Sequence, residues 1–374
     1  MRMQVLLDAR LGRKPTGIGT YVIGLATALP GLAPGEFRVL CRPRHRRMLA
    51  AAGARPITQL RGSRLPRGFP SFDLFHGPNF HTPEVSSTAA RVATIHDIGY
   101  RLLPECHPAG MPERLDALVR ASIAGTRLFL CNSQHTAEAF AAEYGIGPER
   151  LAVTPLAVDA ATFSSASAAE NERDRLARVY GLNRPYVLFV GAMVPRKDLR
   201  TLVRSWALVA REQPELDLVL AGSKILRWAS DWPHVEAWLR ENPDLAHRVR
   251  VLEYVPARDL PALYRGAAAV MLTSLLEGFG LPVLEAMAAE RPVVVTRSGA
   301  LPEVGGDAAY YGDVRDPASL AAGLSAALAG EGWTRRVAAS RAIVARHTWQ
   351  RTAKLTLAAY REAVASPLGS GLLR

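Results

Sequence analysis

The sequence predicts an α/β protein with two doubly wound parallel sheets in series. Short runs of β-branched and aliphatic residues alternate with longer amphipathic segments, as in parallel α/β proteins. The pattern breaks at a polar, alanine-rich stretch, 160–184, and then starts again. A chain of 374 residues is also too long for a single ordinary hydrophobic core and fits two domains. Because ligands of such sheets bind beyond the carboxyl ends of the strands, functional residues should follow these runs.

In the first half, strands are expected at 4–8, 38–41, 73–76, 91–96, 128–131 and 151–155. Helices fit between them at 18–29, 111–124 and 133–144, the last with Ser133 as its N-cap. The uncharged stretch from Pro15 to Gly35 contains several prolines and glycines, which suit a membrane helix poorly. It therefore predicts a glycine loop followed by a buried helix.

In the second half, strands are expected at 186–192, 216–222, 249–254, 268–274, 292–296 and 308–311. The stretch 160–184 reads as a loop followed by a short helix. After Lys197 the apolar positions keep helical spacing, which predicts a further helix there.

Composition is that of a folded protein, with 49% apolar and 21% charged residues. The three cysteines include no CxxC pair, which argues against a disulfide framework or a zinc site. Asp8 interrupts the first apolar run before it could act as a signal peptide. These features predict a cytoplasmic protein.

Positive charge is concentrated in residues 36–70, here called the basic segment. It holds nine arginines against one acid, so +8 of the net charge of +12 lies there. Such a cluster fits an anionic partner, which could be a membrane surface, a phosphorylated acceptor or nucleic acid. The alternative is a solvated, arginine-rich face without a partner.

The stretch "LLEGFGLPVLEAM", residues 275–287, follows the expected strand 268–274 and carries two carboxylates eight residues apart. Pro282 favours the first turn of a helix, and the glycines allow close backbone approach. We expect Glu277 on the loop at the strand end and Glu285 in the first helical turn. Both could then face one cleft, beside amide groups suited to phosphate.

Arg196 and Lys197 lie between the expected strand 186–192 and a helix. Two cations at a helix N-terminus oppose the helix dipole, and a bound anion would remove that conflict. The alternative is a solvent-exposed pair partly offset by Asp198.

In the first half, His96 ends a strand, and Gly17 and Gly19 precede a helix. His96 could donate to a ligand hydroxyl or be a core histidine satisfied by Asp97. The glycines offer an approach for phosphate or sugar. They do not form a dinucleotide fingerprint, because Val22 occupies the third glycine position. The chain also contains no Gly-Lys pair, so a Walker A loop is absent.

The stretches "VGAMVPRKDLRTLVRSW", "LLEGFGLPVLEAMAAERPVVVTRSGALPEV" and "TIHD…CNSQHTAEAF" resemble the retaining glycosyltransferases of family 4, in the GT-B superfamily. The resemblance is densest from 186 to 315. It implies two Rossmann-like domains facing each other across a cleft, the second binding a nucleotide sugar. Residues 1–165 would form the acceptor-side domain, joined by a crossover helix in 347–374, and 166–346 the donor-binding domain.

Carried over to this chain, the resemblance makes Glu277 and Glu285 the family's paired glutamates. Glu285 would hold the ribose hydroxyls and Glu277 would lie by the transferred sugar. Arg196 and Lys197 would bind the diphosphate. The remaining donor contacts would be the amides of Phe279, Gly280 and Leu281, with Gly17, Gly19 and the catalytic-site residue His96 contributed by the other domain.

Departure of a nucleoside diphosphate requires stabilisation of its charge, and two cations with a helix start can supply it. The sequence has no Asp-x-Asp at a strand end, so we expect no metal and no cofactor beyond the nucleotide-sugar substrate. Family members retain anomeric configuration without an agreed nucleophile, so Glu277 is not assigned that role.

The leading hypothesis is transfer of mannose or a rhamnose-like hexose, from a GDP-sugar, to a lipid-linked or polysaccharide acceptor in bacterial surface glycan or lipopolysaccharide biosynthesis. Arg38–Arg67 of the basic segment would then dock on anionic membrane at its inner face. One alternative is a GT-B epimerase that rearranges a UDP-sugar without an acceptor. Another is a nucleic-acid-binding protein, although the basic segment lacks interleaved aromatic residues.

Overall fold

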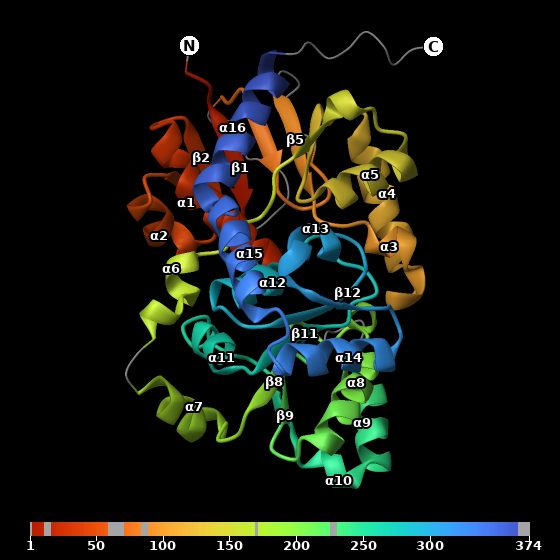
Figure 1. The fold of residues 1–374 in the computed structure, drawn as a ribbon. Coiled ribbons are helices and arrows are strands. Elements are labelled where there is room, and N and C mark those ends of the chain that lie inside the picture. Colours follow the sequence, from red (N-terminus) through yellow and green to blue (C-terminus); the bar gives the residue numbers. More distant parts are fainter. Residues whose placement is uncertain are drawn as a thin grey trace. The chain divides into compact units, whose positions relative to one another are not determined.

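A computed structural model describes residues 2–10, 16–58, 71–83, 89–168, 171–224 and 230–365 (Figure 1). The chain divides into two compact units, each with its own parallel sheet. The first unit comprises Met1–Ile98, Glu113–Ala157 and His347–Arg374, and the second comprises Gly99–Pro112 and Val158–Arg346. The predicted fold class, two parallel α/β sheets in series, is confirmed.

The sheet of the first unit has the strand order β3-β2-β1-β4-β5-β6-β7, and all neighbours pair in parallel. Six of its strands were predicted from sequence, and β3 was missed. Pro56 lies in β3, which tolerates it because the strand is short and at the sheet edge. The strands are β1 Val5–Ala9, β2 Phe37–Cys41, β3 Arg55–Thr58, β4 Leu74–Gly77, β5 Ala90–Ile95, β6 Leu128–Cys131 and β7 Leu151–Val153.

The main helices of the first unit are α1 Gly17–Leu32, α2 Arg46–Ala51, α4 Met111–Ile123, α5 Gln134–Tyr144 and α16 Trp349–Ala365. Ser133 caps α5 as predicted, because its hydroxyl accepts from the amide of Thr136 at 3.0 Å. The expected glycine loop before α1 is wrong in one respect: Gly17 and Gly19 already lie in its first turn. No described helix is long and apolar enough to cross a membrane.

The C-terminal helix α16 packs on the first unit, as the predicted crossover requires. Figure 1 shows it beside α1, and it also contacts β5 and β6 of the sheet. A β-carbon at Gly24 of α1 would lie 2.3 Å from the Trp349 ring, so only glycine allows this close approach. Tyr360 and His76 share a buried hydrogen bond of 2.6 Å, and Thr352 donates to the Pro155 carbonyl at 2.7 Å.

The sheet of the second unit has the order β10-β9-β8-β11-β12-β13, again with parallel neighbours. Most of the predicted strands here end later than the observed ones, because their last residues belong to the loops that follow. Those loops carry the candidate site. The strands are β8 Tyr186–Val190, β9 Asp217–Ala221, β10 Val249–Leu252, β11 Ala269–Leu272, β12 Val293–Thr296 and β13 Tyr310–Gly312.

Helices of the second unit cover both faces of its sheet. The apolar face of α8 contributes the fully buried Trp206 to the core, against Val187 and Met271 of the sheet. The helices are α3 Gly99–Leu102, α6 Ala160–Phe163, α7 Glu172–Tyr180, α8 Leu199–Glu212, α9 Trp232–Glu241, α10 Pro243–Ala246, α11 Leu260–Gly266, α12 Leu281–Ala288, α13 Leu301–Gly305, α14 Pro317–Leu328 and α15 Trp333–Arg346.

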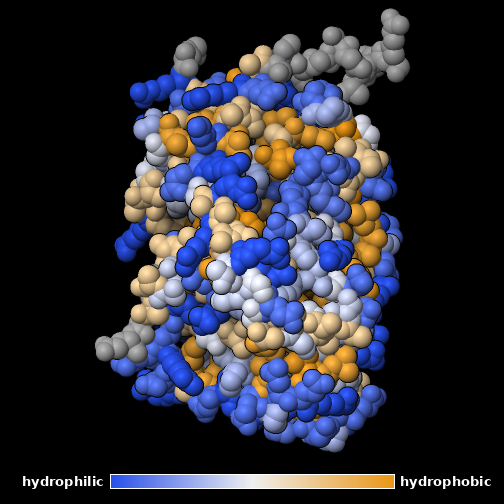
Figure 2. Space-filling model, viewed as in Figure 1, coloured by the Kyte–Doolittle hydropathy of each residue, from blue (hydrophilic) through white to orange (hydrophobic). Residues whose placement is uncertain are grey.

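The surface mixes hydrophilic and hydrophobic side chains, and the face in Figure 2 shows both kinds interspersed. In the basic segment, Arg44, Arg46 and Arg47 are exposed on and before α2. Met48 in the same helix is 41% exposed. Arg61, Arg64 and Arg67 lie outside the described residues.

Candidate functional site

Glu277 lies buried on the loop after β11, where it contacts two cations. Its carboxylate accepts from Arg196 Nη1 at 3.2 Å, from Ser274 Oγ at 2.6 Å and from Lys197 Nζ. Burial alone would raise the pKa of this carboxyl, but the charges of Lys197 and Arg196 and the hydrogen bonds lower the pKa to about 2. We call these four residues the Glu277 cluster. The Glu277 carboxyl is ionised at neutral pH, so the cluster as a whole carries a net charge of +1.

The two cations are placed by a short 3-10 turn, Pro195–Lys197, that is hydrogen-bonded to the end of β11. Thr273 donates to the carbonyls of Lys197 and Asp198 at 2.9 and 3.0 Å. The amide of Leu275 donates to the Arg196 carbonyl at 2.8 Å. The loops after β8 and β11 are therefore held together at the carboxyl edge of the sheet.

The alternative of a solvent-exposed pair is corrected, because the Arg196 and Lys197 side chains are mostly buried. Asp198 beside them has a role in the backbone. It is the N-cap of α8, in a left-handed conformation with φ of 47°, and accepts from the amide and hydroxyl of Thr201. The side chains of Arg196 and Lys197 are only 19% and 12% exposed and pair with Glu277 instead.

The loop after β12 contacts the backbone of Glu277. The amide of Ala300 donates to the Glu277 carbonyl at 2.9 Å. Gly299 has φ of 57°, and a β-carbon there would lie 2.3 Å from the same carbonyl oxygen. Sequence reasoning missed both Ser274 and Gly299. Their only signal was their position: Ser274 is the last residue of the predicted strand 268–274, and Gly299 follows the predicted strand 292–296.

Glu285 lies in the second turn of α12, which corrects its expected position in the first turn. The helix begins at Leu281, with Pro282 in the first turn as predicted and Gly280 as N-cap. Tyr264, which sequence reasoning did not single out, donates its hydroxyl to Glu285 Oε2 at 2.6 Å. Burial raises the pKa of the Glu285 carboxyl to about 7, although the Tyr264 hydrogen bond acts to lower it.

The start of α12 brings backbone amides to the loop that carries Glu277. Phe279 is buried, and Gly280 has φ of 105°, so a side chain there would be strained. The amide of Leu281, at the first helical position, has no acceptor within the helix itself. The arrangement places a helix N-terminus after a buried, cation-paired carboxylate.

His96 and the two glycines belong to the first unit. His96 Nε2 is 2.8 Å from the Pro78 carbonyl oxygen, and its ring meets Tyr21 edge-on at 5.2 Å. Burial lowers the pKa of His96, so the ring is neutral at physiological pH. Thr16 caps α1 by accepting from the Gly19 amide at 3.2 Å. The structure thus brings together Glu277, Arg196 and Lys197 in the second unit. Of the other predicted site residues, His96, Gly17 and Gly19 lie in the first unit.

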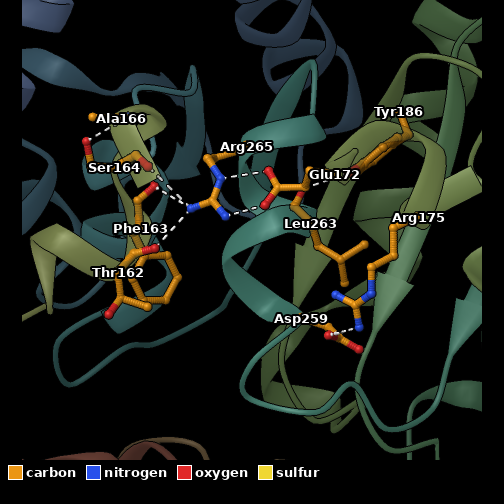
Figure 3. A network of polar contacts seen from close by, with 10 residues as sticks. All are labelled: Thr162, Phe163, Ser164, Ala166, Glu172, Arg175, Tyr186, Asp259, Leu263 and Arg265. Atoms are coloured by element: carbon orange, nitrogen blue, oxygen red, sulfur yellow. Dashed lines mark hydrogen bonds and ion pairs between the residues drawn. The ribbon is translucent and has the colours of Figure 1, made fainter. Parts of the chain in front are cut away.

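The segment that enters the second unit from β7 is fastened to α11. Figure 3 shows the Arg265 guanidinium between the Glu172 carboxylate and three backbone carbonyls. Its Nε donates to Glu172 Oε2 at 2.8 Å, and its Nη1 donates to the carbonyls of Thr162, Phe163 and Ser164 at 2.9 to 3.3 Å. These contacts fix α6 next to Tyr264.

Among the described residues, no group of three or more histidine, cysteine, aspartate or glutamate side chains could hold a metal ion. Cys41, Cys106 and Cys131 are buried free thiols.

Sequence profiles of two sugar-transferring families match the chain. Glycosyl transferases group 1 matches residues 184–330, and Glycosyltransferase Family 4 matches residues 15–162. With the parallel α/β units and the cluster at the strand ends, these matches define the class as a glycosyltransferase. A curated relative, O-antigen chain mannosyltransferase B of Escherichia coli, is 32% identical over 77% of this chain and 74% of its own length. The chain belongs to glycosyltransferase family 4, in the GT-B superfamily.

Solved structures agree with this fold. Sucrose-phosphate synthase from Thermosynechococcus elongatus superposes with a TM-score of 0.76 at 20% identity, covering 98% of this chain and all of that one. HepE of Anabaena, solved in complex with UDP-glucose, has a TM-score of 0.71 at 19% identity, covering 96% of this chain and 100% of its own.

Proposed function

We propose that this glycosyltransferase moves mannose, or a related hexose such as rhamnose, from a GDP-sugar to a lipid-linked or polysaccharide acceptor in bacterial surface glycan assembly. The observation that carries the proposal is the Glu277 cluster, in which two cations surround a buried carboxylate beside a helix start. The choice of sugar and acceptor is supported by the similarity to O-antigen chain mannosyltransferase B.

In this proposal Arg196 and Lys197 bind the donor diphosphate. Sugar transfer breaks the bond to the leaving phosphate, so negative charge grows there in the transition state. At an effective dielectric near 20, one cation about 4 Å from that charge contributes roughly 4 kcal/mol of attraction. Two such cations and the amides of Phe279, Gly280 and Leu281 then supply the stabilisation that a metal supplies elsewhere.

Glu277 lies by the transferred sugar and holds both cations in place. A carboxylate with a pKa of about 2 is a weak base, and its oxygens already accept from three side chains. It is therefore unsuited to act as general base or nucleophile. Retention of configuration then follows a front-face route, in which the donor phosphate accepts the proton of the acceptor hydroxyl as the new glycosidic bond forms.

Glu285 holds the ribose hydroxyls in this proposal. The first unit contributes Gly17 and Gly19 to the donor and His96 to a sugar hydroxyl.

A panel of nucleotide sugars tests the donor assignment. We expect GDP-mannose to raise the melting temperature of the purified enzyme more than UDP-, dTDP- or ADP-sugars, because a ligand stabilises in proportion to its occupancy. The stabilisation and the transferase activity should both survive treatment with excess chelator. Stabilisation by a UDP-sugar alone would overturn the GDP assignment. Activity that is lost on chelation and restored by a divalent ion would overturn the metal-free site.

We also propose that the basic segment docks the enzyme on the inner face of the cytoplasmic membrane. Arg44, Arg46 and Arg47 are exposed together around the start of α2, and lipid anions attract such residues by about 1 kcal/mol each. Replacing all three by glutamate should therefore release the enzyme from vesicles of anionic lipid in a flotation assay. Hydrolysis of the donor should stay unchanged, because these residues lie outside the Glu277 cluster.

The matched control replaces three exposed arginines of the second unit, Arg204, Arg211 and Arg258, by glutamate. This variant has the same net charge but keeps the basic segment. If both variants are released from the vesicles to the same extent, net charge drives binding and the basic segment does not. Vesicle binding that persists in the first variant would contradict the docking proposal.

A further inference from the structure

Tyr264 and Glu285 form a hydrogen-bonded pair in the second unit. Tyr264, on α11, is completely buried, and its hydroxyl donates to Glu285 Oε2 at 2.6 Å. Glu285, on α12, is only partly buried. A completely buried phenol thus holds one oxygen of a carboxylate that still reaches solvent.

The Tyr264 ring is itself held in place. Phe163 of α6 meets it edge-on, with 5.5 Å between the ring centroids. The next residue, Arg265, binds the backbone carbonyls of Thr162, Phe163 and Ser164, as Figure 3 shows. Because α6 packs on both α11 and α12, the phenol has little freedom to turn away from Glu285.

We propose that Tyr264 is a positioning residue for Glu285: its hydroxyl holds Oε2, which directs the carboxylate toward the ribose hydroxyls of the nucleotide donor. The inference rests on the proposed role of Glu285 as the ribose ligand. Without the Tyr264 hydrogen bond, the Glu285 side chain would lose rotamer freedom each time a donor bound. With that bond, the freedom is already lost on folding, so donor binding does not carry this entropy cost. Tyr264 itself does not touch the donor.

The other charged side chains on the elements packed against α12 either pair with groups other than Glu285 or are exposed to solvent. Arg265 pairs with Glu172, Arg341 with Glu290, and Arg336 donates to the carbonyls of Asp307 and Ala309. The further charged side chains on α13 and α15 are exposed: Glu303, Arg335 and Arg346. Tyr264 has a pKa well above its ordinary value, first because of burial, and so stays a neutral donor.

The protonation state of Glu285 should therefore govern donor affinity. Two ribose hydroxyls donate best to an ionised carboxylate, and burial raises the pKa of Glu285 to about 7. Donor affinity of the wild-type enzyme should fall as the pH drops through about 7. Removing the Tyr264 hydroxyl takes away a bond that favours the ionised form, so this fall should begin at higher pH.

The test compares Tyr264→Phe with wild type. We expect the KM for the donor to rise roughly 10- to 150-fold, the range for a lost hydrogen bond to a charged group, while kcat changes less than about twofold. The acid limb of the kcat/KM profile should move to higher pH. Tyr180→Phe is the matched control, because Tyr180 donates to another carboxylate, Asp259 at the start of α11, at the same distance of 2.6 Å, and its loss leaves the Tyr264–Glu285 bond intact. It should leave both the KM and the profile unchanged.

Glu285→Gln separates this inference from the proposed function. Wild-type kinetics in Tyr264→Phe, with impaired donor binding in Glu285→Gln, would overturn the positioning role alone. Unchanged donor affinity in Glu285→Gln would overturn the ribose assignment on which it rests. If Tyr264→Phe does not fold, Phe163→Leu takes its place: it removes the ring that packs edge-on against Tyr264 and should also raise the KM for the donor, whereas an unchanged KM would contradict the inference.

Discussion

Replacing Lys197 by alanine should slow sugar transfer by roughly 30- to 1000-fold, if the ammonium contributes about 2 to 4 kcal/mol to the transition state. In the structure Lys197 reaches Glu277 from the turn before α8, at the carboxyl edge of the sheet. Charge on the leaving phosphate grows during bond breaking, so the lost interaction is stronger in the transition state than in the bound donor. The effect should therefore fall mainly on kcat in a steady-state assay.

Arg211→Ala is the matched control, because Arg211 is an exposed cation near the other end of α8. Arg211→Ala should leave kcat within about twofold of wild type, because a substitution of an exposed residue outside the Glu277 cluster has little effect. Folding of Lys197→Ala can be checked by its melting temperature, since Glu277 keeps its contacts with Arg196 and Ser274. A kcat close to wild type in a folded Lys197→Ala enzyme would contradict its role at the diphosphate.

Replacing Glu277 by glutamine should destabilise the enzyme by about 3 kcal/mol, because removing one partner of a buried ion pair leaves the other charges uncompensated. Here two cations, both mostly buried, would lose their carboxylate. For a unit of this size the melting temperature should fall by roughly 6 to 12 °C. Glutamine keeps the shape of the side chain, so the change isolates the charge.

The pH dependence of this loss has a definite sign. The pKa of Glu277 is lowered in the folded protein, so its contribution is present above the ordinary glutamate pKa and is lost as the pH falls through about 2. The difference in melting temperature should therefore be constant from about pH 8 to 5 and shrink below about pH 4.

Glu290→Gln is the matched control for stability. Glu290 pairs with Arg341 at 2.7 Å, but the two side chains are 32% and 68% exposed. Such a surface pair contributes about 0 to 1 kcal/mol, so this variant should melt within a few degrees of wild type. An equally small effect of Glu277→Gln would show that the Glu277 cluster is not a coupled, buried network.

Local sequence patterns determined the sheets of this protein. Runs such as 186–192 and 268–274 predicted strands because a parallel strand, buried on both faces, needs a continuous apolar stretch. Ser133 predicted a helix start, because an N-cap depends on groups only a few residues away. The strand β3 was missed because its proline and exposed residues carry no such pattern.

The sequence by itself also placed Arg196, Lys197 and Glu277 after strands of one sheet, so their meeting at its edge could be anticipated. Only the tertiary structure decided their pairing. Lys197 and Glu277 are 80 residues apart, and no local pattern encodes a bond across that distance. For the same reason Tyr264, 21 residues before Glu285, stood out only once α11 and α12 were packed together. Burial then separated the two carboxylates chemically, since cations lower the pKa of Glu277 to about 2 whereas desolvation raises that of Glu285 to about 7.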